Sequence, residues 1–107
     1  MSFNILPTPL FDRELKRLSK KYLSVKSDLS LLLADLGKNP NAGKALGNNC
    51  FKIRMAISSK NKGKSGGARV ITYVKIVDEA IYLLSIYDKS ESDTISDAEL
   101  LSRIKGL

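Results

Sequence analysis

The hydrophobic periodicity of this chain changes from a helical to a strand pattern, and that change limits the folds it can adopt. Before residue 37, apolar residues recur every three or four positions, which predicts two helices. Thr8-Pro9 provides a cap and a first-turn proline for a helix over 9–22. Its stripe is Phe11, Leu15, Leu18 and Tyr22. The stripe of the second helix is Val25, Leu29, Leu32, Leu33 and Leu36, with Gly37 at its end.

Strand patterns dominate after residue 50. Three alternating or continuously apolar runs predict strands over Phe51–Ile57, Ala68–Val77 and Ala80–Tyr87. The polar stretch Ser58–Gly67 predicts a hairpin loop between the first two. Ser2–Leu6 is a short apolar run before Pro7, which predicts an edge strand. Ser96 and Glu99 form a capping box that opens a final helix.

These elements follow one another in the order β-α-α-β-β-β-α. We expect an α+β fold in which a small antiparallel sheet packs against an N-terminal helical hairpin. The hairpin buries its apolar stripes on one face of the sheet, so the other face is expected to carry the basic residues. A chain of 107 residues is long enough for one modest core, and we therefore expect a single domain over residues 1–107.

The charge of the chain is concentrated in one segment. All eleven carboxylates lie outside residues 36–77, whereas that segment contains nine lysines and arginines. The formal net charge of +7 therefore arises there. In the predicted strands, Lys52 shares a face with Arg54, and Arg69 shares one with Tyr73 and Lys75. A concentrated charge destabilises a compact fold by self-repulsion, so this segment predicts a polyanionic partner such as a nucleic-acid backbone.

Several classes of protein are disfavoured by what the sequence lacks. There is no histidine, which removes most zinc sites and the commonest general base, and we expect no cofactor and no metal. The single cysteine, Cys50, excludes an internal disulfide. No apolar run is long enough to cross a membrane, and the first residues do not resemble a signal peptide. These features predict a cytoplasmic protein.

Motifs along nearly the whole chain resemble the RelE superfamily of bacterial toxins, in particular its HigB-like branch. The resemblance is carried by Phe11-x-x-Glu14-Leu15-Lys16 with Lys20-Lys21-Tyr22, by Asn39-Pro40-x-x-Gly43, by Phe51-Lys52-Ile53-Arg54 with Lys62–Ile71, and by Ile81–Glu91. It implies a toxin of a toxin–antitoxin pair that enters the ribosome and cuts mRNA without a metal. It also implies a cognate antitoxin, typically a small helix-turn-helix protein encoded nearby.

Metal-independent RNA cleavage transfers a 2′-hydroxyl to the adjacent phosphorus, and it requires a base, an acid and cations. Arg54 and Arg69 suit the phosphoryl oxygens because a guanidinium matches phosphate with two hydrogen bonds. Lys52 is a candidate base, since positive neighbours disfavour its protonated form. The resemblance places Lys89 near the leaving group. Tyr73 shares a face with Arg69 and completes the predicted catalytic set.

A second set of residues is expected to bind RNA or the ribosome without taking part in the chemistry: Lys60, Lys62, Lys64, Lys75 and Tyr87. RelE carries a catalytic tyrosine a few residues after its last basic position, whereas residues 91–95 of this chain contain none. The identity of the base and any codon preference therefore stay open. Two other functions also stay open. ParE-like relatives share the fold and inhibit DNA gyrase, and a non-catalytic nucleic-acid-binding module would carry similar charges.

Overall fold

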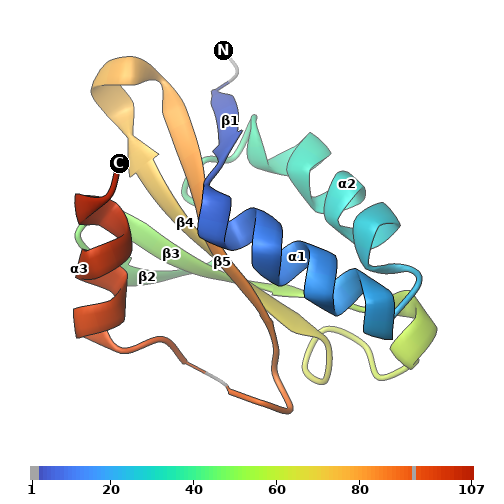
Figure 1. The fold of residues 1–107 in the computed structure, drawn as a ribbon. Coiled ribbons are helices and arrows are strands. Elements are labelled where there is room, and N and C mark those ends of the chain that lie inside the picture. Colours follow the sequence, from blue (N-terminus) through green and yellow to red (C-terminus); the bar gives the residue numbers. More distant parts are fainter. Residues whose placement is uncertain (1–2, 93) are drawn as a thin grey trace.

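A five-stranded mixed sheet with three α-helices is the framework of the chain (Figure 1), and the computed structural model describes residues 3–92 and 94–107. The elements are β1 (Asn4–Pro7), α1 (Pro9–Lys21), α2 (Val25–Leu36), β2 (Lys44–Gly47), β3 (Cys50–Met55), β4 (Ala68–Lys75), β5 (Ala80–Asp88) and α3 (Asp97–Lys105). Short 3-10 turns occupy Ser58–Lys60 and Ile76–Asp78. Ser2, where the first predicted strand began, lies outside the described residues.

The predicted α+β fold and its order of elements are confirmed, with one additional strand. The strand order is β1-β5-β4-β3-β2, in which β1 pairs parallel with β5 and all other neighbours are antiparallel. The additional strand is β2, which joins β3 through a two-residue turn at Asn48 and Asn49. Both asparagines have positive φ, as a type I′ hairpin turn requires.

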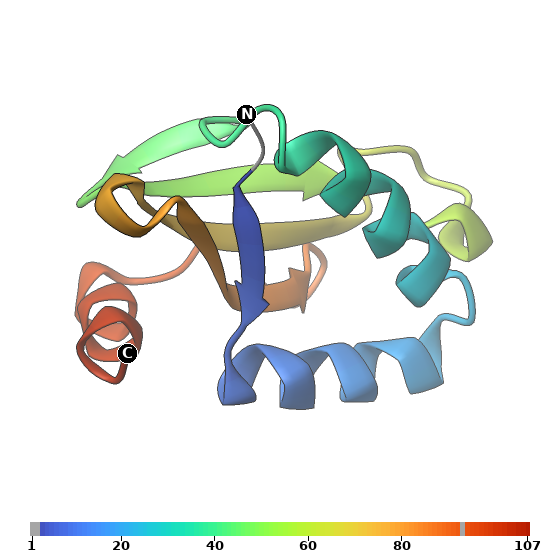
Figure 2. The same ribbon diagram turned by 90° about the horizontal axis from the view of Figure 1, so that it is seen from above.

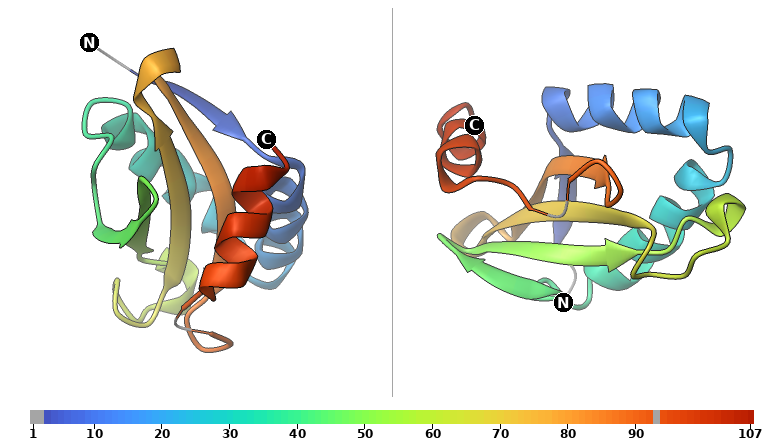
Figure 3. Two further views of the ribbon diagram at one scale, coloured as in Figure 1. Left: turned by 90° about the vertical axis from the view of Figure 1, so that its left-hand side faces the viewer. Right: turned by 90° about the horizontal axis from the view of Figure 1, so that it is seen from below.

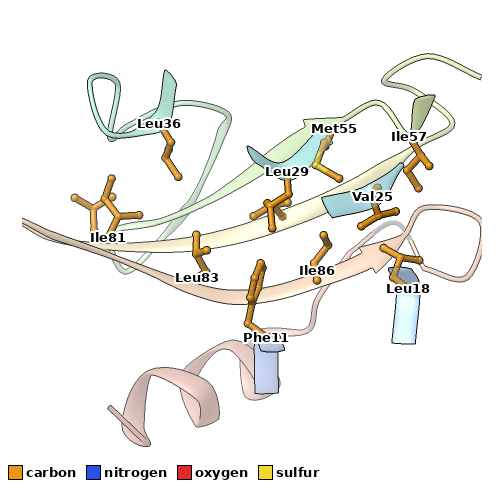
Figure 4. Packing of buried hydrophobic residues seen from close by; sticks show 13 residues of the cluster. Phe11, Leu18, Val25, Leu29, Leu36, Met55, Ile57, Ile81, Leu83 and Ile86 are labelled. Carbon is orange, nitrogen blue, oxygen red and sulfur yellow. The ribbon is translucent and has the colours of Figure 1, made fainter. Parts of the chain in front are cut away.

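The main core lies between the helical hairpin and one face of the sheet. Figure 4 shows Phe11 and Leu18 of α1 and Leu29 of α2 directed toward Leu83 and Ile86 of β5. Side chains from alternate positions of β3, among them Met55, pack into the same cluster, as the period-two pattern predicted. The side chain of Thr8 accepts a hydrogen bond from the N–H of Phe11, which confirms the predicted cap of α1.

The opposite face of the sheet is partly covered by α3, so the expectation of an open basic face is wrong where α3 packs against it. Figure 2 shows α3 across the sheet from α1 and α2. Leu100 of α3 forms a second buried cluster with Cys50, Ile71 and Leu84. In the left view of Figure 3, α3 stands beside β5 and leaves β2 and β3 to one side. The reason is that β4 and β5 are apolar on both faces and both faces need a cover.

An ion pair joins the two helices that flank β5. Arg103 of α3 donates from Nη1 to Glu14 Oε1 at 2.8 Å and from Nη2 to Glu14 Oε2 at 3.1 Å. Arg103 Nη1 also donates to the carbonyl of Leu84 at 2.7 Å, and Glu14 Oε1 accepts from the N–H of Ile86 at 3.4 Å. Because β1 ends opposite Leu83, these side chains bind main-chain groups of β5 that β1 does not reach.

We predict that Glu14→Gln destabilises the fold by about 1–3 kcal/mol. The change removes the charged acceptor of the half-buried Arg103 and of the N–H of Ile86 at the edge of β5. Urea unfolding measures the loss. Glu99→Gln is the matched control, because Glu99 pairs with the same arginine at 3.4 Å from an exposed position and should cost less than about 0.5 kcal/mol. Equal effects of the two changes would contradict the assigned role of Glu14.

Candidate nucleic-acid interface

A hollow of about 580 Å³ opens on the uncovered part of the sheet face, and its lining is strongly basic. The lining residues are Gly43, Lys44, Lys52, Ile53, Arg54, Lys64 and Arg69. Five of these seven residues are cations. We call this feature the cation hollow. It brings together three of the predicted catalytic residues and one predicted RNA-binding lysine.

The register of the sheet sets like charges directly opposite each other. Lys44 of β2 is the cross-strand partner of Lys52, and Arg54 of β3 is the cross-strand partner of Arg69. Directly opposed residues have Cβ atoms about 4.5–5.5 Å apart, and like charges at that separation are destabilising. Two such pairs in one hollow therefore make it a place where an anion would be stabilised.

Lys44 is the member of the cation hollow that sequence reasoning missed. It lies on β2, whose four residues are too few to show an alternating pattern. The turn at Asn48 and Asn49 was the available signal, because adjacent asparagines favour the positive φ of a hairpin turn. Gly43 precedes the strand with φ +94°, and a Cβ there would clash with the carbonyl of Lys52. Glycine therefore allows β2 to lie close against β3.

Arg69 is buried at the edge of the hollow and is not an exposed fork, contrary to the expectation from its sequence. Its relative exposure is 3%. Its guanidinium donates to the carbonyls of Lys64 at 3.0 Å, Ser65 at 3.2 Å and Ala68 at 3.1 Å. Arg69 thus contributes positive charge to the hollow and also fixes the end of the basic loop that carries Lys64.

Lys60 is turned into the protein, although the sequence grouped it with the exposed lysines of the loop. Its ammonium lies 2.6 Å from Oδ1 of Asp88, and the two side chains are 9% and 0% exposed. Tyr22 donates a hydrogen bond to Oδ2 of Asp88 at 3.0 Å, and the Lys60 ammonium lies 5.4 Å from the centre of the Tyr22 ring. Lys60 is therefore an anchor of the loop, whereas Lys62 and Lys64 are exposed.

The pKa of Asp88 is set by opposing effects. Burial alone would raise this pKa, but hydrogen bonds from Lys60, Ser90 and Tyr22 outweigh burial and hold it well below its ordinary value. Asp28 of α2 resembles it, because hydrogen bonds from Ser58 and Ser24 lower its pKa against the opposing effect of desolvation. Both carboxylates bind the first part of the loop between β3 and β4, so that part is held by α2 through Asp28 and by the end of β5 through Asp88.

The remaining predicted site residues lie outside the lining of the cation hollow. Tyr87 is the cross-strand neighbour of Arg69 on the β5 side and is half-buried. Lys89 follows β5, where its N–H donates to the carbonyl of Gly67 at 3.0 Å, and it is exposed.

Tyr73 and Lys75 lie toward the other end of β4. At about 3.3 Å per residue they are some 13 and 20 Å from Arg69. Tyr73 packs in the second cluster beside Tyr82, with ring centres 6.1 Å apart, and Lys75 pairs with Asp78 at 3.0 Å. The structure therefore does not bring these two residues to the hollow.

Other sites of reactivity are few in the described part of the chain. Burial raises the pKa of the Cys50 thiol to about 11, so it is protonated at neutral pH and a poor nucleophile. Residues 3–92 and 94–107 contain no group of three potential metal-ligating side chains, and none of their helices is long and apolar enough to span a bilayer.

The family model and the similar solved structures point to the same family. The model of the family described as "RelE toxin of RelE / RelB toxin-antitoxin system" matches residues 10–105. A free-state arginine-to-alanine double mutant of E. coli toxin RelE is similar in structure, with TM-score 0.65, 20% identity, and coverage of 100% of this chain and 99% of that chain.

Two toxin–antitoxin complexes contain chains of the same fold. The intact E. coli RelBE complex gives TM-score 0.64 and 19% identity, over 81% of this chain and 96% of that chain. The RelBE2 complex from Mycobacterium tuberculosis gives TM-score 0.62 and 16% identity, over 82% and 99%. At these identities the structural matches establish the fold, and the HigB-like branch stays a prediction.

We predict that Asp88→Asn costs about 3–5 kcal/mol of stability at neutral pH, because it leaves the buried Lys60 ammonium without its anion. The wild-type Asp88 has a depressed pKa in the folded state. Its contribution is therefore complete above the unfolded value near 3.9 and is lost as the pH falls below it toward the folded value. Urea unfolding measured from pH 7 down to about pH 3 should therefore show that acidification lowers the free energy of unfolding less in the variant than in the wild type.

Lys21→Met is the control for this measurement. Lys21 lies 3.9 Å from the same carboxylate, but its side chain is 55% exposed. An exposed pair contributes little, so this change should alter stability by less than about 1 kcal/mol. An Asp88→Asn variant as stable as wild type, with the same acid sensitivity, would show that the Asp88–Lys60 pair does not anchor the loop.

Proposed function

Because this chain belongs to the RelE family of toxins of toxin–antitoxin systems, we propose that it stops translation by cutting mRNA on the ribosome. Its site of action is then the cytoplasm, where ribosomes translate. A free toxin of this kind would arrest its own host, so its partner is a cognate antitoxin. The two similar complexes are toxin–antitoxin complexes, which supports such a partner for this chain.

The observation that carries the proposal is the gathering of five cations in the cation hollow. Four of them occupy directly opposed positions, Lys44 with Lys52 and Arg54 with Arg69. An RNA phosphate in the hollow would lie among these side chains. The cations would stabilise the transition state more than the bound substrate, because negative charge accumulates on the phosphoryl oxygens during the reaction.

The proposed reaction needs only the RNA and side chains of this protein. The 2′-oxygen forms a bond to the adjacent phosphorus as its proton leaves to a base, and the bond from phosphorus to the 5′-oxygen breaks as that oxygen gains a proton. Exposed Arg54 is the best-placed cation for the phosphoryl oxygens, and Arg69, buried at the edge of the hollow, supports it with its charge. We assign Lys52 as the base, since it faces the same hollow.

We propose two candidates for the acid that protonates the leaving oxygen. Lys64 lines the hollow, and Lys89 lies outside the lining but is held close to the start of β4 by its main-chain bond to Gly67. Tyr87 is the cross-strand neighbour of Arg69 and so the aromatic residue closest in register to the cations. We propose that it contacts a nucleobase of the RNA. Tyr73 and Lys75 are left out of the proposed chemistry because of their distance along β4.

A gyrase inhibitor on the same fold is the second candidate function. It would not require opposed arginines on a concave sheet face, so the cation hollow favours the ribonuclease. The distinction is experimental: primer extension on cellular mRNA after induction reveals cuts inside translated frames for a ribonuclease, whereas a gyrase inhibitor leaves mRNA intact and alters plasmid supercoiling.

We predict that Arg54→Ala lowers the rate of mRNA cleavage on ribosomes by about 100-fold or more, because it removes a fixed cation from the phosphoryl oxygens. Lys52→Ala should reduce the rate similarly. Cleavage is followed by primer extension in a purified translation system. Lys26→Ala is the control, since this exposed lysine on α2 does not line the hollow, and it should cut as wild type does. Full activity of Arg54→Ala would refute the site assignment.

We predict that a fluorescent single-stranded oligoribonucleotide binds with a log–log salt slope of about −3, because up to five cations replace condensed counterions. Anisotropy titrations at several salt concentrations measure the slope. The double variant Lys44→Ala/Lys64→Ala should make the slope shallower by about one. The charge-matched double variant Lys16→Ala/Lys20→Ala, on α1, should change it less. If the α1 variant has the larger effect, RNA docks on the helical hairpin instead.

A further inference from the structure

The carboxylate of Asp88 lies on the face of the sheet opposite to the cation hollow. Ile86, two residues earlier in β5, packs in the main core under the helical hairpin. Asp88 meets the same side of the molecule, where Tyr22 at the end of α1 donates to its Oδ2 at 3.0 Å. Successive side chains of a strand point to opposite faces. Tyr87 and Lys89, the two neighbours of Asp88, are therefore directed to the face that carries the cations.

The hydrogen-bonding capacity of the Asp88 carboxylate is used within the protein. Its Oδ1 accepts from the ammonium of Lys60 at 2.6 Å and from the N–H of Ser90 at 3.0 Å, and its Oδ2 accepts from Tyr22. The side chain is 0% exposed. A buried carboxylate on the far face of the sheet does not contact RNA in the cation hollow, so Asp88 is not itself a catalytic residue.

Asp88 closes the turn that follows β5. The bond from the N–H of Ser90 to the Asp88 side chain is the contact of an Asx turn. The main-chain carbonyl of Asp88 also accepts from the N–H of Glu91 at 3.0 Å and from that of Ser92 at 3.2 Å. Three successive N–H groups thus converge on one residue, and Lys89 is the residue enclosed by the turn.

Lys89 is also held from the side of β4. Its N–H donates at 3.0 Å to the carbonyl of Gly67, the residue opposite it if the pairing of β4 with β5 continues by one step. Gly67 itself lies close against β3, because a Cβ there would clash with the carbonyl oxygen of Met55. Lys89 is two residues beyond Tyr87, the partner of Arg69, and so about 7 Å along the strand from the arginine row. The long, flexible stem of lysine can span that separation.

We propose that Asp88 is a positioning residue for the cleavage reaction, which directs Lys89 toward the leaving oxygen by closing the turn after β5. The inference rests on the proposed function, in which Lys89 is one of two candidates for the acid. As the bond from phosphorus to the 5′-oxygen breaks, that oxygen takes a proton from the Lys89 ammonium, which becomes a neutral amine. A donor whose main chain is fixed before the substrate binds loses little freedom in the transition state.

Two double variants separate positioning from the anchoring role of the Asp88–Lys60 pair. Lys60→Met/Asp88→Asn and Lys60→Met/Asp88→Leu both lack the ion pair, so neither leaves a buried charge without its partner. The asparagine oxygen can still accept from the N–H of Ser90, whereas leucine cannot. The side chains at position 88 are similar in size and uncharged in both. A difference between the two variants therefore reports the turn.

Cleavage is followed by primer extension in a purified translation system over a range of toxin concentrations. The leucine variant should cut at least about tenfold more slowly than the asparagine variant at saturation. The half-saturating concentration should agree within about threefold, because the cation hollow still binds the RNA and only a transition-state contact is lost. Tyr22→Phe in the asparagine variant is the matched control, since it removes a hydrogen bond to the same position but leaves the turn. It should keep the rate within about twofold.

Adding Lys89→Ala to both double variants tests whether Asp88 acts through this lysine. In the asparagine variant the change should slow cleavage at saturation about tenfold or more, and in the leucine variant less than about twofold, because the lysine is no longer directed. A purely structural role of Asp88 would give the same factor in both. Asp88→Glu is a further test, since it keeps the charge opposite Lys60 but moves the carboxylate away from Ser90. It should slow cleavage about fivefold or more while urea unfolding shows a folded chain.

Equal rates of the two double variants at saturation would overturn this inference, as would equal effects of Lys89→Ala in both. Full activity of a folded Asp88→Glu variant would overturn it as well. In each of these cases the wild-type chain still cuts mRNA, so the proposed function stands. Intact mRNA with the wild-type chain would instead overturn the proposed function, and this inference with it.

Discussion

The structure depends on β4 and β5, which carry apolar side chains on both faces and must therefore be covered on both. The hairpin of α1 and α2 covers one face over the main core, and α3 covers the other only as far as the cluster around Leu100. Three helices cannot cover all five strands. The remaining area lies over the parts of β2 and β3 that carry Lys44, Lys52 and Arg54. The position of the candidate site thus follows from how the core is closed.

The lysines and arginines of the basic segment have two kinds of surroundings in the fold. Lys44 with Lys52, and Arg54 with Arg69, occupy directly opposed positions across β2, β3 and β4. Like charges at such positions disfavour one another. Elsewhere the basic segment meets carboxylates from outside it, as when Lys60 pairs with Asp88 and Lys75 with Asp78. The cation hollow is thus the part of the segment where like charges gather, whereas Lys60 serves as an anchor of the loop.

Two hollows adjoin on the outer side of β3. The cation hollow suits a phosphate backbone, and a mainly apolar groove of about 500 Å³ lies between β3 and α2. Arg54 and Lys64 line both. Asp88 and Asp28 hold the first part of the loop between β3 and β4, and Arg69 binds the carbonyl of Lys64. Contacts within the chain thus position the loop that contributes Lys64 to the lining.

Elements whose signal is local could be predicted from the sequence. The stripes of α1 and α2, the alternation in β3, and the caps at Thr8 and Ser96 depend on neighbours within a few residues, and the structure has all of them. The sequence also placed Lys52 and Arg54 together, because alternation fixes which residues share a face. That Lys44 joins them follows from strand pairing, since β2 has too few residues for a pattern and is defined by its pairing with β3. Burial of Lys60 and Arg69 was likewise decided by distant partners, a carboxylate 28 residues away and carbonyls across a folded loop, which periodicity cannot register.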